Sequence, residues 1–439
     1  MRTSARIFIG STASAMALAA FLVLPASGTS QPGITSTQVS VADIVTQSGV
    51  AAADFAPYES GVLAYFHYVN KVLHGVYGRQ LAVSLSEDDK SDPTQDKTLA
   101  DNIIASNNAF ALVGVATGFF GGAAHDLKVA GIPTFGYGTD NSWTGPKNFF
   151  ADYGSVIDYA TSTPEFAYVA KQVHATKIGI FALNYPSSKY ECQPSVDTMK
   201  SLYGFNVVYS NLSEPIFSAP SFGPEVTNMI NKGVNMIISC MDINSNVALS
   251  KAMQNGGMTA VPQVWVDGYD RSRLMHDASY MKNVYILIQH VPFESNAAFP
   301  GQFPGLQLYF NQMNASGFAS QQYDDVALMG WESANLFVEG LRAAGANPTR
   351  ATVIAAINRI TNDLGGPKGD GVAVGTNWTV AHTMATSPSC DAFVKTSTGV
   401  NPTFSIAFGR GKDPWICFPL TGKANLNSPL PPPRGTPGV

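Results

Sequence analysis

The sequence predicts an α/β protein with two lobes, and three observations support this fold class. Strand-like and helix-like segments alternate over most of the chain, which is typical of parallel sheets with helices on both faces. The alternation forms two series with a similar order of elements. The chain has 439 residues, of which 45% are hydrophobic, so it is too long for one ordinary core and apolar enough for two. We therefore predict two Rossmann-like lobes related by internal duplication and joined by a hinge.

The first strand–helix–strand unit is predicted between residues 38 and 93. Gln38–Val45 (QVSVADIV) has the pattern of a strand, and an amphipathic helix follows it and ends near Asn70. A glycine-containing turn then leads to a second buried strand, Leu81–Leu85. Asp92 and Pro93 are a typical cap and first residue of a further helix. This order of elements is that of a parallel β-α-β unit.

The remaining elements continue the two series. The other predicted strands are Ala109–Val113, Pro133–Phe135, Lys177–Leu183, Asn206–Ser210, Val234–Ser239, Gln263–Val266 and Val284–Gln289. The other predicted helices are Thr94–Ala105, Ser188–Leu202, Gly223–Lys232, Asn244–Gln254, Gln307–Ala315, Tyr323–Ala344 and Thr349–Ile360. Two lobes that face each other across the carboxyl ends of their strands would enclose a ligand cleft.

Composition limits the possible partners and locations. Charged residues are 13% of the chain and the net charge is −5, so we expect no nucleic-acid partner. Residues 1–28 combine Arg2 and Arg6, a largely apolar run (Ile7–Leu24) and small residues, which predicts a signal peptide. An uncleaved helical anchor is the alternative interpretation. No cysteine stands at the expected cleavage site, so we expect an exported protein, periplasmic or at the cell surface, without a lipid anchor.

All four cysteines lie in the part of the chain that we expect to be exported. An even number in an oxidising compartment favours disulfides over metal ligands, and the spacing is too wide for a zinc site. Cys192 follows one predicted strand and Cys240 ends another, so both fall at the same edge of one sheet. Cys390 and Cys417 share a short β-like region. Of the three possible connectivities, we predict Cys192–Cys240 and Cys390–Cys417.

Two stretches of the chain resemble a known family. Gly61–Pro93 (GVLAYFHYVNKVLHGVYGRQLAVSLSEDDKSDP) resembles the opening of the type I periplasmic binding proteins, the branched-chain amino-acid receptor family of ABC importers. In that family a helix ending in Val-Asn, a Gly-Arg turn, a strand ending in Asp-Asp and an Asp-Pro pair follow in this order. Trp331–Ile360 (WESANLFVEGLRAAGANPTRATVIAAINRI) resembles the family's long helix, its Ala-Gly stop and the next helix. The resemblance implies a protein that binds a ligand and does not catalyse a reaction.

The resemblance also implies how the chain is divided. Residues 34–155 and 291–380 are assigned to the first lobe, and residues 156–290 and 381–423 to the second. The segment Gly365–Pro419 departs from the family pattern, because it is longer and contains a cysteine pair. The tail 424–439 ends in the proline-rich sequence SPLPPPRGTPGV and is predicted to be disordered.

Candidate ligand contacts in the first lobe follow two predicted strands. Thr117 and Gly118 lie in a glycine-rich turn before a helix, whose N-terminus favours an anion. A plain strand-to-helix turn is the alternative, but the resemblance implies that Thr117 binds the ligand carboxylate. It also implies contacts from Gly138 and Thr139. Asp140 stands where a family-like threonine would fall, and an acid there would repel a carboxylate and attract a cation.

Candidate contacts in the second lobe are aromatic and acidic. Tyr185 and Tyr190 follow the strand Lys177–Leu183, where the family places an aromatic ring over the ligand. Asp242 and Asp267 follow the next strands, and the resemblance implies that Asp267 pairs with a ligand ammonium. Helix caps or turns are the competing interpretation of both acids. Thr117 and Asp267 suit a zwitterionic amino acid, whereas Asp140 and Asp242 suggest a different ligand.

The function predicted from these residues is solute binding. We expect an exported monomer that captures a small molecule, an amino acid or a related polar or aromatic compound, and delivers it to the permease of an ABC importer. Hinge closure would supply contacts from both lobes. A sensor or scavenger of the same fold without a permease is the alternative, and a secreted α/β hydrolase is a remote one. The sequence has no nucleophile elbow or phosphate loop, and its histidines lack metal-ligand spacing, so we expect no enzyme activity, cofactor or metal.

Overall fold

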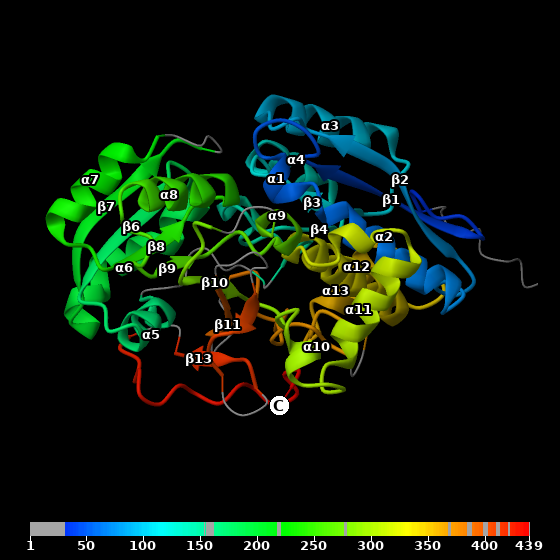
Figure 1. The fold of residues 1–439 in the computed structure, drawn as a ribbon. Coiled ribbons are helices and arrows are strands. Elements are labelled where there is room, and N and C mark those ends of the chain that lie inside the picture. Colours follow the sequence, from blue (N-terminus) through cyan, green and yellow to red (C-terminus); the bar gives the residue numbers. More distant parts are fainter. Residues whose placement is uncertain are drawn as a thin grey trace, which may run out of the picture. The chain divides into compact units, whose positions relative to one another are not determined.

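The computed structural model describes residues 31–438 apart from 153, 155–161, 217–220, 276–278, 368–369, 384–388, 398–402, 410–412 and 420–421. The predicted signal peptide lies outside the described residues. The fold is α/β with two separate sheets, which confirms the predicted fold class (Figure 1).

The first sheet contains five parallel strands in the order β2-β1-β3-β4-β5. Its strands are β1 (Gln38–Val45), β2 (Gln80–Asp88), β3 (Leu112–Ala116), β4 (Thr134–Gly136) and β5 (Phe149–Ala151). Side chains of a strand alternate between the two faces of a sheet. Val41 and Val45 therefore belong to one core, beneath α2 (Tyr58–Lys71) and α12 (Asp325–Ala344). Ile44 belongs to the other core, beneath α3 (Pro93–Ser106) and α4 (Gly121–Ala130).

The second sheet repeats this arrangement. Its strands β6 (Lys177–Leu183), β7 (Asn206–Glu214), β8 (Met236–Cys240), β9 (Gln263–Trp265) and β10 (Val284–Ile288) are parallel, in the order β7-β6-β8-β9-β10. The order matches that of the first sheet strand for strand, as internal duplication requires. One core lies beneath α5 (Pro164–Gln172) and α6 (Pro186–Tyr203). The other lies beneath α7 (Gly223–Lys232) and α8 (Ile243–Asn255).

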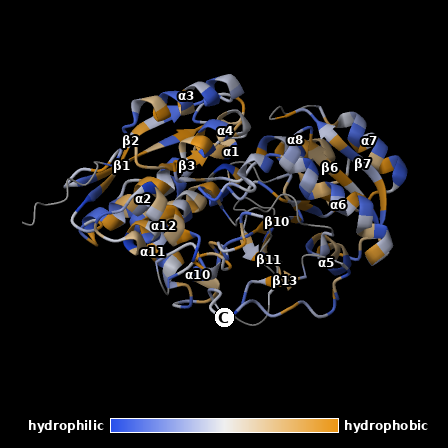
Figure 2. Ribbon diagram, turned by 180° about the vertical axis from the view of Figure 1, so that it is seen from behind, coloured by the Kyte–Doolittle hydropathy of each residue, from blue (hydrophilic) through white to orange (hydrophobic). Residues whose placement is uncertain are grey.

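Burial follows hydropathy in both lobes. Figure 2 shows apolar residues concentrated along the strands, while helices such as α3 and α7 also carry hydrophilic residues. The remaining helices are short or belong to the first lobe's larger core. They are α1 (Ala52–Phe55), α9 (Arg271–Leu274), α10 (Ser295–Ala298), α11 (Pro304–Ala315), α13 (Arg350–Ile357) and the 3₁₀ turns Asn141–Trp143 and Ala319–Gln321.

Helices α2 and α12 approach each other closely because each has a glycine at the crossing. A Cβ atom on Gly61 would lie 1.7 Å from the carbonyl oxygen of Ala327. A Cβ atom on Gly330 would lie 1.9 Å from the carbonyl oxygen of Tyr58. Only residues without a side chain allow the two backbones to meet at this distance. The crossing therefore depends on both glycines, and it joins two helices that each contain part of a segment with the family resemblance.

Most predicted elements have the predicted type, and the ends differ by a few residues. β1, β6 and α7 have the predicted bounds. β3 begins three residues later than predicted, because residues 109–113 form one unbroken buried apolar run that contains no signal for where pairing starts. The three-residue strand β5 was not among the predicted strands, since so short a segment has no measurable periodicity.

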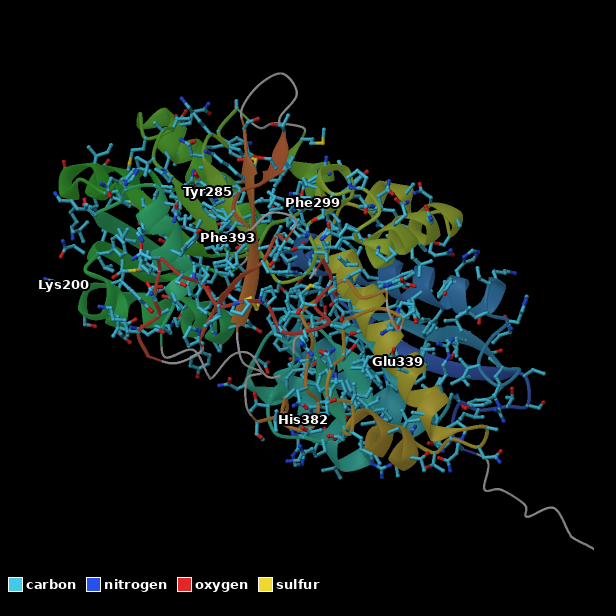
Figure 3. All side chains as sticks on the ribbon, turned by 90° about the horizontal axis from the view of Figure 1, so that it is seen from below. Lys200, Tyr285, Phe299, Glu339, His382 and Phe393 are labelled. Atoms are coloured by element: carbon cyan, nitrogen blue, oxygen red, sulfur yellow. A yellow bond between two sulfur atoms is a disulfide. The ribbon has the colours of Figure 1, made fainter. Side chains whose placement is uncertain are left out.

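The C-terminal strands extend the second sheet. β11 (Ser389–Thr396) pairs antiparallel with β10, with β12 (Phe404–Ile406) and with β13 (Ile416–Phe418). Cys390 lies opposite Cys417 in this ladder, and the two form a disulfide, as predicted. Tyr285 and Phe393 come from the neighbouring strands β10 and β11 (Figure 3). Both rings contact that of Phe408. The lobe bounds given above stay a prediction.

The C-terminal tail, predicted to be disordered over residues 424–439, instead makes hydrogen bonds with the rest of the chain within residues 424–438. The backbone N–H of Leu430 donates to the carbonyl of Cys417 over 2.8 Å. The indole N–H of Trp415 donates to the carbonyl of Pro437 over 3.0 Å, and Gln302 donates to that of Gly438 over 2.7 Å. Composition predicts disorder for a segment that buries little of its own surface. Here the partners come from the rest of the chain, which composition does not reveal.

Candidate functional site

The predicted site residues lie where the parallel strands of both lobes end. Thr117 directly follows β3, and residues 137–140 directly follow β4. In the second lobe, Tyr185 follows β6, Asp242 follows β8 and Asp267 follows β9. Because the two sheets have the same topology, equivalent loops of both lobes lie at the carboxyl ends of the strands, where α/β sheets bind ligands.

The hydroxyl of Thr117 is already engaged by the protein. Thr117 is 1% exposed, and its hydroxyl donates to Asp89, a carboxylate that is itself fully buried. The same oxygen accepts the backbone N–H of Phe119 over 3.0 Å. A ligand carboxylate at this hydroxyl would have to displace Asp89 or lie beside it. Thr117 as a carboxylate contact stays a prediction, and this geometry does not favour it.

Asp140 occupies the start of helix α4. Its Oδ2 accepts the backbone N–H of Gly121 over 3.1 Å, and its Oδ1 accepts that of Ser142 over 2.7 Å. Asp96 lies beside the same turn, and burial together with the Asp89 charge raises its pKa to about 8. The helix N-terminus, which favours an anion, is therefore occupied by the chain's own carboxylate.

Thr139 and Gly138 support this loop from inside the first lobe. The Thr139 hydroxyl donates to the carbonyl of Thr117 over 2.8 Å and so connects the loops after β3 and β4. Gly138 is partly buried, and a Cβ atom there would lie 2.9 Å from the Cβ of Ala151 on β5. Both residues lie in the loop that directly follows β4, as the sequence predicts.

Tyr185 brings the second lobe to the first. Its hydroxyl donates to the carbonyl of Gly118, so the loop after β6 contacts the loop after β3. Burial, and then the charge of Asp140, raise the pKa of Tyr185. Tyr190 lies on the next turn of α6 and is 41% exposed. The structure therefore joins Tyr185 and Gly118 directly and leaves Tyr190 largely at the surface.

Asp242 serves as the N-cap of α8. It is 3% exposed, and its Oδ1 accepts the Ser245 backbone N–H over 3.0 Å while its Oδ2 accepts the Ser245 hydroxyl over 2.6 Å. This is the cap interpretation that the sequence left open. Asp270 likewise caps α9 by accepting the backbone N–H of Arg273 over 3.0 Å.

Asp267 is fixed next to Asp242 by an asparagine of α8. The Asn246 amide donates to the carbonyl of Asp267 over 2.9 Å and to that of Met241 over 2.8 Å. Burial raises the pKa of Asp267 well above its usual range, and the charges of Asp54, Asp325, Asp242 and Glu191 raise it further, in that order. Asp267 therefore lies among carboxylates from several segments.

Four of the residues around Asp267 were not predicted as site residues. Asp54 belongs to helix α1, and its Oδ1 accepts the backbone N–H of Ile243 at the start of α8 over 3.2 Å. Burial, followed by the charge of Asp242, raises the pKa of Asp54 to about 8. Asp325 begins α12, and burial together with Asp270 raises its pKa to about 7. The others are Tyr137, after β4, and Glu191, on α6.

Tyr137 is the aromatic neighbour of these acids. Burial raises the pKa of its hydroxyl, and Asp267 is the charge that raises it most. Its ring meets that of Phe55 edge to face, with centroids 5.7 Å apart. A helix as short as α1 and the first residue of α12 have no recognisable site pattern, so only the position of Tyr137 after a strand was a signal that sequence reasoning could have used.

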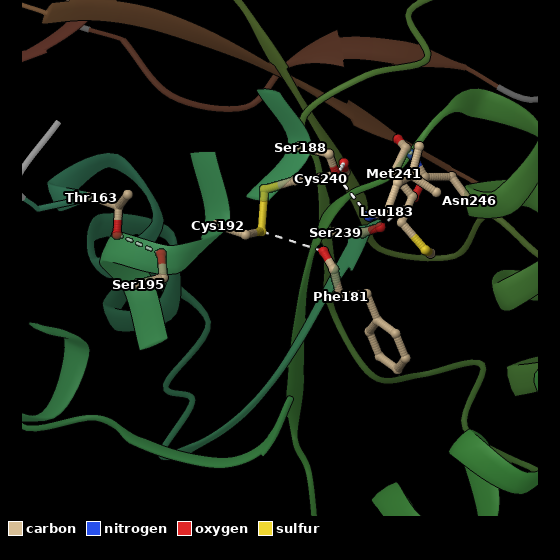
Figure 4. Close-up of a disulfide and its surroundings, with 10 residues drawn as sticks. All are labelled: Thr163, Phe181, Leu183, Ser188, Cys192, Ser195, Ser239, Cys240, Met241 and Asn246. Carbon is tan, nitrogen blue, oxygen red and sulfur yellow. Dashed lines mark hydrogen bonds between the residues drawn. A yellow bond between two sulfur atoms is a disulfide. The ribbon is translucent and has the colours of Figure 1, made fainter. Parts of the chain in front are cut away.

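The second disulfide lies just behind this edge. Cys192 on α6 and Cys240 at the end of β8 are bonded, as predicted (Figure 4). Next to it, the Ser188 hydroxyl accepts the Leu183 backbone N–H over 2.7 Å and donates to the carbonyl of Cys240. These bonds tie the loop after β6, which holds Tyr185, to the end of β8, which holds Asp242.

Two kinds of feature are absent from the part of the chain that the structure describes. Within it, no group of three or more His, Cys, Asp or Glu side chains is arranged to hold a metal ion. Within the same residues, no helix has the length and apolar character needed to cross a bilayer.

Solved structures share this fold at low sequence identity. The fatty acid ABC transporter substrate-binding protein from Thermomonospora curvata aligns with a TM-score of 0.69 at 16% identity, over 94% of this chain and 99% of its own. The solute binding protein of an ABC transporter from R. palustris, in complex with 4-hydroxybenzoate, aligns with a TM-score of 0.68 at 17% identity, over 85% and 97%. The branched-chain amino acid transporter substrate binding protein from Streptococcus pneumoniae, in complex with isoleucine, aligns with a TM-score of 0.64 at 16% identity, over 84% and 99%.

Sequence comparison identifies the family. No match was found among curated protein sequences. The family model described as "Periplasmic binding protein" matches residues 38–387, which is most of the chain. Together with the duplicated sheets and the shared fold, this match shows that the chain belongs to the type I periplasmic binding proteins.

Proposed function

We propose that this protein captures a small solute between its two lobes, outside the cytoplasm, and delivers it to the permease of an ABC importer. The observation that supports this most is the meeting of loops from both lobes at the carboxyl ends of their strands. Tyr185 contacts Gly118 there, and Ile243 contacts Asp54. A ligand bound at such a junction gains contacts from both lobes and shifts the protein towards its closed form.

The proposed ligand contacts are those of the sequence analysis together with the neighbours found in the structure. They are Thr117, Gly118, Gly138, Thr139, Asp140, Tyr185, Tyr190, Asp242 and Asp267, extended by Asp54, Tyr137 and Asp325. We further propose that the protein acts as a monomer, without a cofactor and without turnover of its ligand. Amino acids and aromatic acids are the compounds to test first, because relatives with this fold are described in complex with isoleucine, 4-hydroxybenzoate and benzoate.

The experiment is a ligand screen with two readouts. The purified protein is tested by thermal shift against amino acids, amides, amines and small aromatic acids, and each hit is measured by small-angle scattering. We expect at least one compound to raise the melting temperature and to reduce the radius of gyration, because the ligand binds the closed form. If no compound changes either quantity, the proposal fails. Incubation of the hit with the protein and recovery of the intact compound would support binding without turnover.

A further inference from the structure

Four carboxylates from four separate segments converge at the lobe junction. They are Asp54 on α1, Asp242 after β8, Asp267 after β9 and Asp325 at the start of α12. Hydrogen bonds hold the segments together. The Ile243 backbone N–H donates to Asp54 Oδ1 over 3.2 Å, and the Asn246 side-chain amide donates to the backbone carbonyl of Asp267 over 2.9 Å. The Asp325 N–H donates to the Tyr269 carbonyl over 3.4 Å. The charges that act most strongly on Asp267 are all carboxylates.

One oxygen in this group is buried and has no partner. Asp54 is 4% exposed, and its Oδ2 has no hydrogen bond to any part of the chain that the structure describes. Its other oxygen holds the start of α8, directly beside the capping residue Asp242. A buried acceptor without a donor is costly. A bound N–H donor at this position would satisfy it.

Arg273, a positive side chain that acts on Asp54, is directed elsewhere. Arg273 lowers the pKa of Asp54, but its contribution ranks below those of burial, the Asp242 charge and the Ile243 N–H. Its guanidinium donates to the side-chain oxygen of Asn244. Burial and the neighbouring acids raise the pKa values of Asp54 and Asp267, and a positively charged group bound beside them would favour their ionised form.

The position that would hold a ligand carboxylate is filled. Asp140 accepts the N–H of Gly121 at the start of α4, and the Thr117 hydroxyl donates to Asp89. A second carboxylate brought to this turn would meet two acids of the protein. The relatives described in complex with isoleucine and 4-hydroxybenzoate bind compounds that contain a carboxylate. The charge arrangement in this chain opposes that class of ligand.

We propose that the ligand of this protein is an amine without a carboxylate, whose ammonium group binds between Asp54 and Asp267 beside the ring of Tyr137. This inference rests on the proposed function and specifies its ligand class. The unpartnered oxygen of Asp54 requires an N–H donor, so primary and secondary amines fit and quaternary ammonium ions do not.

The test compares compounds of similar size and different charge. Calorimetry measures butylamine, phenethylamine, putrescine and spermidine against butyrate, butyramide, tetramethylammonium, isoleucine and 4-hydroxybenzoate. We expect binding and compaction with at least one amine and with neither butyrate, isoleucine nor 4-hydroxybenzoate. Asp267→Asn should weaken the best amine about tenfold or more, since a charge-assisted hydrogen bond is lost. Asp101→Asn makes the same charge change on the exposed face of α3 and should leave the affinity unchanged.

Each other outcome has a definite meaning. If an acid or an amino acid binds and compacts the protein while the amines do not, the ligand class is wrong and the proposed function stands. If no compound of any class binds, both proposals fail. If an amine binds equally well to Asp267→Asn, or if Asp101→Asn weakens it as much, the assigned site is wrong. Asp54→Asn provides a second variant, and circular dichroism spectra that match those of the unsubstituted protein show that each variant is folded.

Discussion

Tyr58 is a buried residue whose hydroxyl joins three segments of the first lobe. It is fully buried on α2, its hydroxyl donates to Asp152 Oδ2 over 2.8 Å, and it lies 2.6 Å from the Ser333 hydroxyl on α12. Tyr58→Phe keeps the ring and removes the hydroxyl, so an oxygen of Asp152 loses its donor. We expect the free energy of unfolding to fall by about 1–3 kcal/mol, measured by urea denaturation.

A tyrosine at the surface provides the control for Tyr58→Phe. Tyr77 is 53% exposed, and its hydroxyl donates to the carbonyl of Arg342 over 2.7 Å. Water can replace that bond, so Tyr77→Phe should change the free energy of unfolding by about 0.5 kcal/mol or less. Equal effects of the two substitutions would contradict the role given to the buried hydroxyl.

Candidate residues that follow strands can be predicted from the sequence, whereas those that tertiary packing brings to the same place cannot. Thr117, Asp242 and Asp267 were predictable because the ends of parallel strands share one edge. Asp54 and Asp325 were not, because a four-residue helix and a helix start carry no such rule. Hydrogen-bond partners could not be predicted either. Nothing in the sequence pairs Thr117 with Asp89, and because the Thr117 hydroxyl donates to Asp89, it is not free to donate to a ligand.

The crossing of α2 and α12 is the element-scale feature on which the first lobe depends. Gly330→Ala would place a methyl group where the Tyr58 carbonyl oxygen lies 1.9 Å away, so the helices must separate. Overpacking of this kind costs about 1–3 kcal/mol, and more where only backbone surrounds the new atom. We therefore expect a clear loss in melting temperature, measured by differential scanning calorimetry.

The matched control for the crossing is another helical glycine with space around it. A Cβ atom on Gly223, at the start of α7, meets nothing closer than Ser221 Oγ at 3.8 Å. Gly223→Ala should therefore be neutral or slightly stabilising. If Gly330→Ala is as stable as Gly223→Ala, the close approach of the two helices is wrong.

Element types were predictable from the sequence, but element ends were less so. Alternating apolar positions and caps such as Asp92 identified the strands and helices of both lobes. The disulfide Cys192–Cys240 was predictable because Cys192 follows β6 in the chain and Cys240 ends the neighbouring strand β8. The start of β3 was not, since Ala109, Phe110 and Ala111 are as buried as the strand itself. The contacts of residues 422–438 depend on Trp415 and Cys417, which are close only in the folded chain.

Several carboxylic acids of the protein have pKa values that burial raises, and these acids make the free energy of unfolding depend on pH. Burial raises the pKa of Asp54, Asp96 and Glu191 to about 8, and that of Asp325 to about 7. These values lie above those of the unfolded chain, near 4. Each group therefore contributes stability that is fully present below pH 4 and is lost as the pH rises through 7 to 8.

Two buried histidines oppose this trend at lower pH. Burial lowers the pKa of His290 to about 3 and that of His382 to about 4. Their contribution is present above their unfolded pKa, near 6.5, and is lost as the pH falls below it. Between pH 6.5 and 8 an unfolded histidine binds at most about half a proton, so the four acids outweigh the two histidines. The ligand-free protein should therefore become more stable as the pH falls from 8 to 6.5.

Asp96→Asn isolates one of the groups responsible. Asp96 is fully buried beside α4, away from the four carboxylates of the lobe junction, and asparagine keeps its shape without a proton to bind. Each such acid contributes a slope of up to about 1.4 kcal/mol per pH unit. Urea denaturation between pH 6.5 and 8 should therefore give a shallower slope for Asp96→Asn than for the unsubstituted protein. Asp101→Asn, whose side chain is 49% exposed, should leave the slope unchanged. An unchanged slope in Asp96→Asn would mean that Asp96 is ionised in the folded protein at these pH values, which would contradict its raised pKa.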